Sequence, residues 1–82
     1  MLNIYMLKNI NKYEDGEEYF HVDLFNTEDD ARKQMNSEFN EFLESDYGNN
    51  KNELDVCEID ETTAELRDGL HVSTWEIDMQ SL

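Results

Sequence analysis

The chain has 82 residues with 21 acidic and six basic side chains, so its formal net charge is −15 at pH 7. Charge of this density opposes compaction through self-repulsion, and its sign disfavours direct binding to nucleic acid or to anionic lipid. Apolar residues make up 38% of the chain and aromatic residues 11%, more than an acidic disordered tail carries, which predicts a single folded domain over residues 1–82.

Cysteine content and hydropathy indicate where in the cell the protein is expected to be found. Cys57 is the only cysteine, which excludes an internal disulfide and a zinc site built from several thiolates. The apolar start of the chain, residues 1–8, lacks the basic region and the cleavage site of a signal peptide, and no apolar run approaches the roughly 20 residues of a membrane span. We therefore expect a cytoplasmic protein that does not enter a membrane.

Alternating apolar residues predict two strands at the start of the chain, over residues 2–7 and 19–25. The Asp15–Gly16 step between them is a turn signal, so the two strands are expected to form a hairpin. On the second strand the apolar residues that share one face are Phe20, Val22 and Leu24.

An amphipathic helix is expected over about residues 28–46. Thr27 provides the N-cap, and the three acidic residues that follow suit the positive end of the helix dipole. Gly48 is a suitable C′ residue beyond the last turn. The apolar stripe consists of Ala31, Met35, Phe39, Phe42 and Leu43.

The second half predicts a third strand over residues 54–59 and a last strand over residues 70–79. Residues 62–67 are compatible with a strand, and the Asp68–Gly69 step after them is a hairpin turn signal, so one strand or a strand pair precedes the last strand. Val72 and Trp75 have opposite parity in the final strand, so we expect either a bulge near Ser73–Thr74 or burial on both faces. The fold class is α+β: an antiparallel sheet of about four strands in β-β-α-β-β order, with one helix packed on it. The core is expected to include Phe20 with Phe39, Phe42 and Trp75. The four tyrosines are expected either to be partly buried at the rim of the core or to be exposed, where they could contact a partner.

Acidic residues recur three or four apart on the helix and two apart on the strands. Such side chains share a face and stand at separations comparable to those of phosphates along one DNA strand. We therefore expect them to bind a basic nucleic-acid-binding protein. The predicted partner-binding residues are Glu38, Glu41, Glu44, Asp55, Glu58, Asp60, Glu61, Glu76 and Asp78.

No pattern in the sequence is typical of an enzyme. It contains no glycine-rich phosphate loop, no HExxH motif and no recognisable nucleophile context, so we expect no catalytic residue, no cofactor and no metal site. Two weaker alternatives are a histidine pair and a calcium site. His21 and His71 could form a catalytic or zinc-binding pair if their strands are neighbours. Residues 46–50 partly match a calcium-binding loop, but Gly48 is misplaced in it.

Small size, a charge of −15, an α+β plan with acids on helix and strands, and the absence of a catalytic motif resemble the small inhibitors of phages and mobile elements. These include anti-CRISPR and anti-restriction proteins. The resemblance implies a DNA mimic that occupies the DNA-binding groove of a CRISPR effector or other defence nuclease in the host cytoplasm.

The alternative is an acidic adaptor or antitoxin-like protein that binds a basic partner without inhibiting a DNA enzyme. Both a monomer and a homodimer are compatible with the sequence, because open edge strands favour self-association whereas like charge opposes it.

Overall fold

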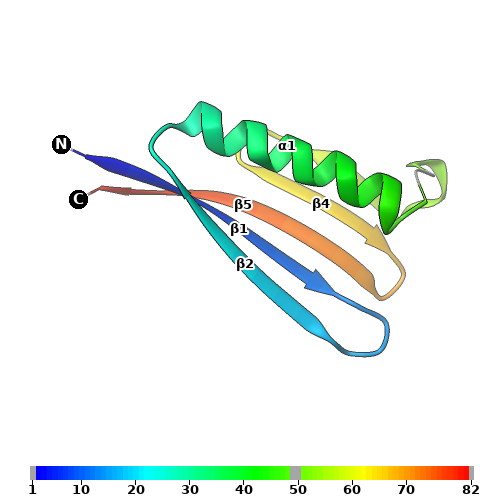
Figure 1. The fold of residues 1–82 in the computed structure, drawn as a ribbon. Coiled ribbons are helices and arrows are strands. Elements are labelled where there is room, and N and C mark those ends of the chain that lie inside the picture. Colours follow the sequence, from blue (N-terminus) through cyan, green and yellow to red (C-terminus); the bar gives the residue numbers. More distant parts are fainter. Residues whose placement is uncertain (1, 49–50, 82) are drawn as a thin grey trace.

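The computed structural model describes residues 2–48 and 51–81, and within them five strands form one antiparallel sheet with a helix packed across one face (Figure 1). The strand order is β2-β1-β5-β4-β3, so β2 and β3 are the edges. The α+β class is confirmed, with five strands rather than about four because the strand pair after the helix is complete. In chain order the elements are β1 (Asn3–Lys12), β2 (Glu18–Phe25), α1 (Glu28–Ser45), the short 3-10 helix η1 (Lys51–Glu53), β3 (Val56–Ile59), β4 (Thr63–Asp68) and β5 (His71–Ser81).

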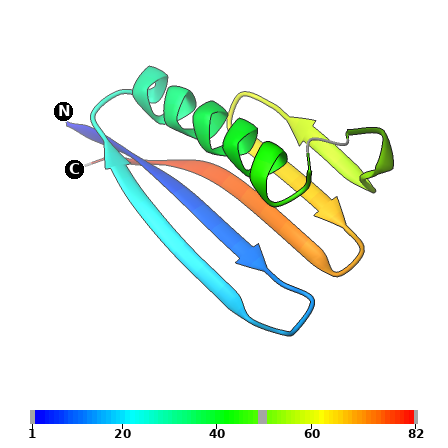
Figure 2. The ribbon, with the colours of Figure 1, turned by 45° about the vertical axis from the view of Figure 1, so that its right-hand side comes forward.

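The first and last strands, β1 and β5, lie side by side in the middle of the sheet (Figure 2). They pair in one continuous register that begins with Asn3 opposite Ser81, so the bulge predicted near Ser73–Thr74 does not occur in β5. Val72 is half-buried on one face and Trp75 is buried on the other. This arrangement matches the alternative prediction of burial on both faces.

The helix begins and ends close to its predicted bounds because its start signals are local. Thr27 Oγ1 accepts a hydrogen bond from the Asp30 N–H at 3.2 Å, as an N-cap should. At the other end the Asp46 N–H donates to the Phe42 carbonyl at 2.8 Å, and Asp46 is the C-cap. Gly48 has a φ of 66° but lies two residues beyond the cap, so it is not the C′ residue that the sequence predicts.

The core lies between α1 and one face of the sheet. Every fourth residue of the helix, from Ala31 to Leu43, is buried there against side chains of β1, β4 and β5. Phe39 and Trp75 are buried as predicted, and Phe42 packs partly buried beside them. The buried hydrophobic residues are Leu7, Ala31, Met35, Phe39, Leu43, Tyr47, Ala64, Leu66, Trp75 and Ile77.

The predicted burial of Phe20 is wrong, since 64% of its surface is exposed. In the β1–β2 register the core residue Leu7 lies opposite Asp23, whereas Lys8 lies opposite Val22. The apolar face of β2 therefore points away from the helix. Its three apolar residues are on one face, as the sequence predicts, but that face carries no second layer in the described residues.

Tyr47 is more deeply buried than either prediction for the tyrosines, exposure or partial burial at the rim of the core. It lies just after α1, where the chain turns onto the sheet, and only 6% of its surface is exposed. Its hydroxyl donates to the Leu66 carbonyl at 3.2 Å and lies 3.0 Å from Ser73 Oγ. These bonds satisfy the polar end of a buried ring, which explains how a tyrosine can close this end of the core.

Candidate functional site

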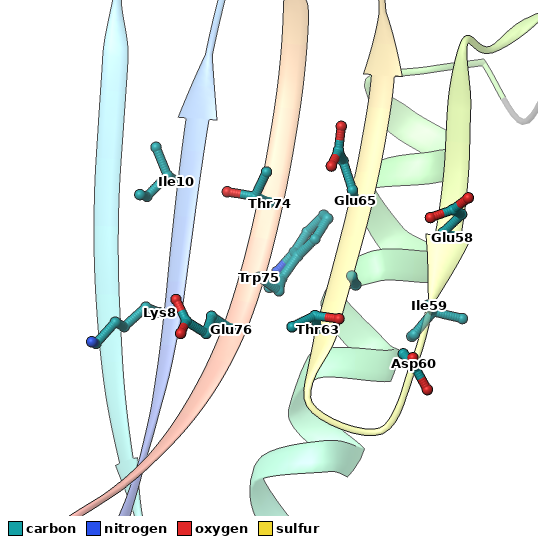
Figure 3. Close-up of a pocket in the computed structure, with 11 residues that line it drawn as sticks. Lys8, Ile10, Glu58, Ile59, Asp60, Thr63, Glu65, Thr74, Trp75 and Glu76 are labelled. Carbon is teal, nitrogen blue, oxygen red and sulfur yellow. The ribbon is translucent and has the colours of Figure 1, made fainter.

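One side of the sheet is covered by α1, and we call the other side the open face. Its acidic residues gather on the β3–β4–β5 half. Glu58 comes from β3, Glu65 from β4, and Glu76 and Asp78 from β5. We call these four residues the acidic patch. Figure 3 shows three of them, Glu58, Glu65 and Glu76, on neighbouring strands with the helix behind the sheet.

The acidic patch borders a hollow of about 660 Å³ on this face. The hollow exists because the twisted sheet curves and its central side chains are short, Thr63 and Thr74 among them. Four carboxylates and one amine line it. The lining residues are Lys8, Ile10, Glu58, Ile59, Asp60, Thr63, Ala64, Glu65, Thr74, Trp75 and Glu76.

Two of the carboxylates face each other directly. Glu58 and Glu65 are Cα partners in the β3–β4 register, which places their Cβ atoms about 4.5–5.5 Å apart on the same face. Arg67 Nη2 lies 3.1 Å from Glu65 Oε2 and offsets one of the two charges. No described cationic group lies within 4.0 Å of Glu58. Like charges directly opposite one another destabilise a sheet, so this pair is unfavourable in the isolated protein.

The other end of the acidic patch contains one ion pair. Lys8 Nζ donates to Asp78 Oδ2 at 2.7 Å. This hydrogen bond, supported by the charges of Asp78 and Glu76, raises the pKa of Lys8 above its ordinary value. Glu76 lies opposite Lys8 in the β1–β5 register, but no described cationic group lies within 4.0 Å of its carboxylate. The acidic patch therefore keeps a net negative charge.

The helix residues of the predicted site lie on the opposite side of the sheet. Glu41 and Glu44 are exposed on α1. Glu38 is half-buried, and its carboxylate accepts hydrogen bonds from Gln34 Nε2 at 2.9 Å and from Trp75 Nε1 at 3.4 Å. Helix and strand acids thus do not converge on one face, because the sheet stands between them.

Three predicted residues lie at the ends of strands. The Asp55 carboxylate accepts from the Gly69 N–H at 2.9 Å and so holds the β4–β5 turn. Glu61 lies 3.5 Å from Arg32 on the helix. Asp60, in the same turn as Glu61, lines the rim of the hollow. Of the nine predicted residues, three line the hollow: Glu58, Asp60 and Glu76. Asp78 lies outside it, two residues beyond Glu76 on the same face of β5.

The site residues that the sequence prediction missed are Glu65, Lys8 and Arg67. Alternation along residues 63–67 would have placed Glu65 and Arg67 on one face. Their juxtaposition with Glu58 depends on the strand register, and no local pattern carries that information. Lys8 reaches Asp78 across 70 positions of sequence, which only the β1–β5 pairing brings together.

The two weaker alternatives gain no support from the geometry. His21 on β2 and His71 on β5 are separated by β1. His21 Nε2 lies 3.1 Å from Asp23 Oδ1, and the His71 ring stacks between Tyr13 and Tyr47. Across residues 2–48 and 51–81 no group of three or more His, Cys, Asp or Glu side chains is arranged to hold a metal ion. Asn49 and Asn50 of the partial calcium loop lie outside the described residues.

In the part of the chain that the structure describes, α1 is too polar to span a bilayer, and no other helix is long enough to do so. Comparison of the chain with protein-family models, with curated proteins and with solved structures gives no match.

Proposed function

We propose that this protein is a non-enzymatic DNA mimic that binds the DNA-binding groove of a CRISPR effector or other defence nuclease and blocks target DNA. The observation that carries the proposal is the direct pairing of Glu58 with Glu65 beside a hollow of net negative charge. Such an arrangement lowers the stability of the free protein, and cationic groups of a partner would relieve the repulsion.

The spacing of the acidic patch suits a groove that holds phosphates. Glu76 and Asp78 alternate along β5 and so stand about 7 Å apart. Neighbouring strands supply carboxylates at right angles to this row, with Glu65 on β4 and Glu58 on β3. Carboxylates accept two parallel hydrogen bonds from an arginine, and arginine and lysine are the side chains with which proteins contact phosphates.

Electrostatic attraction of this kind acts mainly on the association rate. We expect the protein to bind its target quickly at low ionic strength and much more slowly as salt screens the acidic patch. The remaining carboxylates of the chain add a long-range negative field that steers the encounter, without each touching the partner.

A second candidate function is an acidic adaptor or antitoxin-like protein. The observation that favours it is the apolar part of the open face, where Phe20 and Leu24 are 64% and 63% exposed. Exposed apolar side chains do not help a protein to imitate phosphates. They would help it to bind a partner that has both basic and apolar groups, because such a partner could contact the acidic patch and the apolar part of the open face together.

The test is DNA cleavage by a panel of CRISPR effectors and restriction enzymes, with the protein added before or after the target DNA. A DNA mimic inhibits only when it is added first. The informative variant is Glu58→Gln/Glu65→Gln/Glu76→Gln, which neutralises three open-face carboxylates. Its matched control is Glu41→Gln/Glu44→Gln/Glu53→Gln, which makes the same change of charge at exposed positions outside the sheet.

We expect the open-face variant to lose inhibition and the control to retain it. The reverse result would assign binding to the helix side and contradict the role of the acidic patch. Inhibition in either order of addition would mean that DNA binding is not the blocked step. An absence of inhibition across the panel would favour the adaptor, to be tested by co-purification with a partner that has no nuclease activity.

A further inference from the structure

The edge strand β2 lacks most of the devices that usually protect the edge of a sheet. It is eight residues long, contains no proline and no lysine, and follows β1 without a bulge from Tyr5 opposite Phe25 to Lys12 opposite Glu18. Short strands, lysines, prolines, bulges and inward-pointing charges keep edges from pairing with another chain, and of these β2 has only Asp23, on the helix-covered side opposite Leu7. The other edge strand, β3, has only four residues. The less protected edge is therefore β2.

The side chains of β2 are also unusually exposed for their type. Phe20 and Leu24 are 64% and 63% exposed, and Val22 between them is 37% exposed. On the opposite side of the strand Tyr19 is 55% exposed. Phe20, Val22 and Leu24 lie on the open face, which the helix does not cover. The β1–β2 hairpin also extends away from α1, so the helix leaves Tyr19 at the beginning of β2 uncovered (Figures 1 and 2).

The sequence of β2 is close to a palindrome in chemical type. Reading outward from Val22, an ionisable residue, an apolar residue and an aromatic residue follow on each side. The outward series is His21, Phe20 and Tyr19 in one direction and Asp23, Leu24 and Phe25 in the other. A segment with this symmetry is complementary to an antiparallel copy of itself.

We propose that a second copy of this chain pairs with β2 through its own β2, antiparallel, with the two-fold axis at Val22. This register sets Val22 against Val22 of the second copy and Phe20 against Leu24 on the open face. On the other side His21 faces Asp23. The two sheets join into one of ten strands, and the exposed backbone groups of each edge gain partners.

Charge is compatible with this pairing in spite of the net −15 of each copy. His21 already lies 3.1 Å from Asp23 within one chain, and the dimer adds the same pair across the axis twice. Glu18 would face Asn26, so no carboxylate opposes another along the strand. The two β5 strands are five strand spacings apart, about 24 Å, which exceeds the Debye length at physiological salt.

The contact is small for a protein interface, so we expect a dimer that dissociates at low concentration. Sedimentation equilibrium of the whole chain over a range of concentrations should show a monomer–dimer equilibrium that added salt strengthens. Val22→Lys sets two like charges against each other at the axis and should raise the dissociation constant about tenfold or more. Ile59→Lys on β3 is the control, because Ile59 is also branched and 41% exposed, and it should leave the equilibrium unchanged.

The register has a test of its own. His21→Asp opposes carboxylates across the axis and should weaken the dimer, whereas His21→Asp combined with Asp23→His restores opposite partners and should recover it. Circular dichroism confirms that each variant folds. A wild-type chain that stays monomeric at every salt concentration would overturn the proposal and leave the β2 edge to a different protein. A dimer that Ile59→Lys weakens and Val22→Lys does not would place the contact at β3 and overturn it too.

Discussion

The indole nitrogen of Trp75 lies 3.4 Å from Glu38 Oε1, which links the centre of β5 to the middle of α1. Trp75 is 2% exposed, and both Phe39 and Phe42 pack edge-on against its ring. The half-buried Glu38 therefore has a partner in the core that the exposed helix acids Glu41 and Glu44 lack. Its charge was predicted to serve binding, yet its position serves the core.

The first prediction separates these two roles of Glu38. Glu38→Leu leaves the Trp75 N–H without an acceptor, which should lower the free energy of unfolding by about 1–2 kcal/mol. Glu38→Gln keeps an acceptor oxygen and should lose less than half of that. Urea unfolding measures both variants. Equal stability of all three proteins would contradict the role of this hydrogen bond.

The second prediction concerns Glu58, whose charge is expected to favour partner binding but to lower the stability of the free protein. Glu58→Lys replaces a like-charge pair with an opposite-charge pair across β3 and β4, which should stabilise the fold by about 0.5 kcal/mol. Thermal unfolding should show a midpoint higher by about 2–4 °C. The same variant should bind a basic partner less well. Glu53→Lys, outside the sheet, makes the same change of net charge. It should raise the unfolding midpoint less than Glu58→Lys does, and it should weaken partner binding less.

Local signals predicted the elements well. The helix runs from Glu28 to Ser45 against a prediction of about 28–46, because Thr27 caps it and an apolar stripe defines its inner face. The Asp15–Gly16 and Asp68–Gly69 steps both form hairpin turns, with positive φ at each glycine. Each of these features depends on residues that are close in sequence.

The arrangement of faces was harder to predict. Alternation shows which side chains share a face, but it does not show which face the helix covers. In β1, Asn9 and Asn11 are buried and hydrogen-bonded to each other while Ile10 is exposed, the reverse of what hydropathy predicts. Asn9 Nδ2 also donates to the Thr74 carbonyl. The hydrogen bonds that satisfy these buried amides depend on which strands pair and in which register. The position of Glu58 opposite Glu65 depends on strand register in the same way.

The third prediction follows from the net charge of −15. Repulsion among carboxylates destabilises the folded chain more than the expanded one, and salt screens it. Raising sodium chloride from about 10 mM to about 500 mM shortens the Debye length from about 30 Å to a few ångströms, so the midpoint of thermal unfolding should rise. The rise should be smaller in Glu58→Lys, and the measurement is differential scanning calorimetry at matched pH. A midpoint independent of salt would show that the repulsion is already relieved within the fold.

The last prediction concerns alkaline pH and the buried end of the sheet. Burial raises the pKa of Tyr47 above its ordinary value of 10.0. The folded state therefore holds this proton more tightly than the unfolded state, and stability is fully present below about pH 10 and declines as pH rises through the folded pKa. Tyr47→Phe removes the bonds to Leu66 and Ser73, which should cost about 1 kcal/mol at neutral pH. The variant should lose less further stability than the wild type between pH 9 and pH 11, measured by urea unfolding at each pH. The pKa of Tyr13 is also raised by burial, that of Tyr19 by its hydrogen bond to Glu17 and that of Lys8 by its hydrogen bond to Asp78, so some decline should persist. An unchanged alkaline slope in Tyr47→Phe would assign the effect to those three residues.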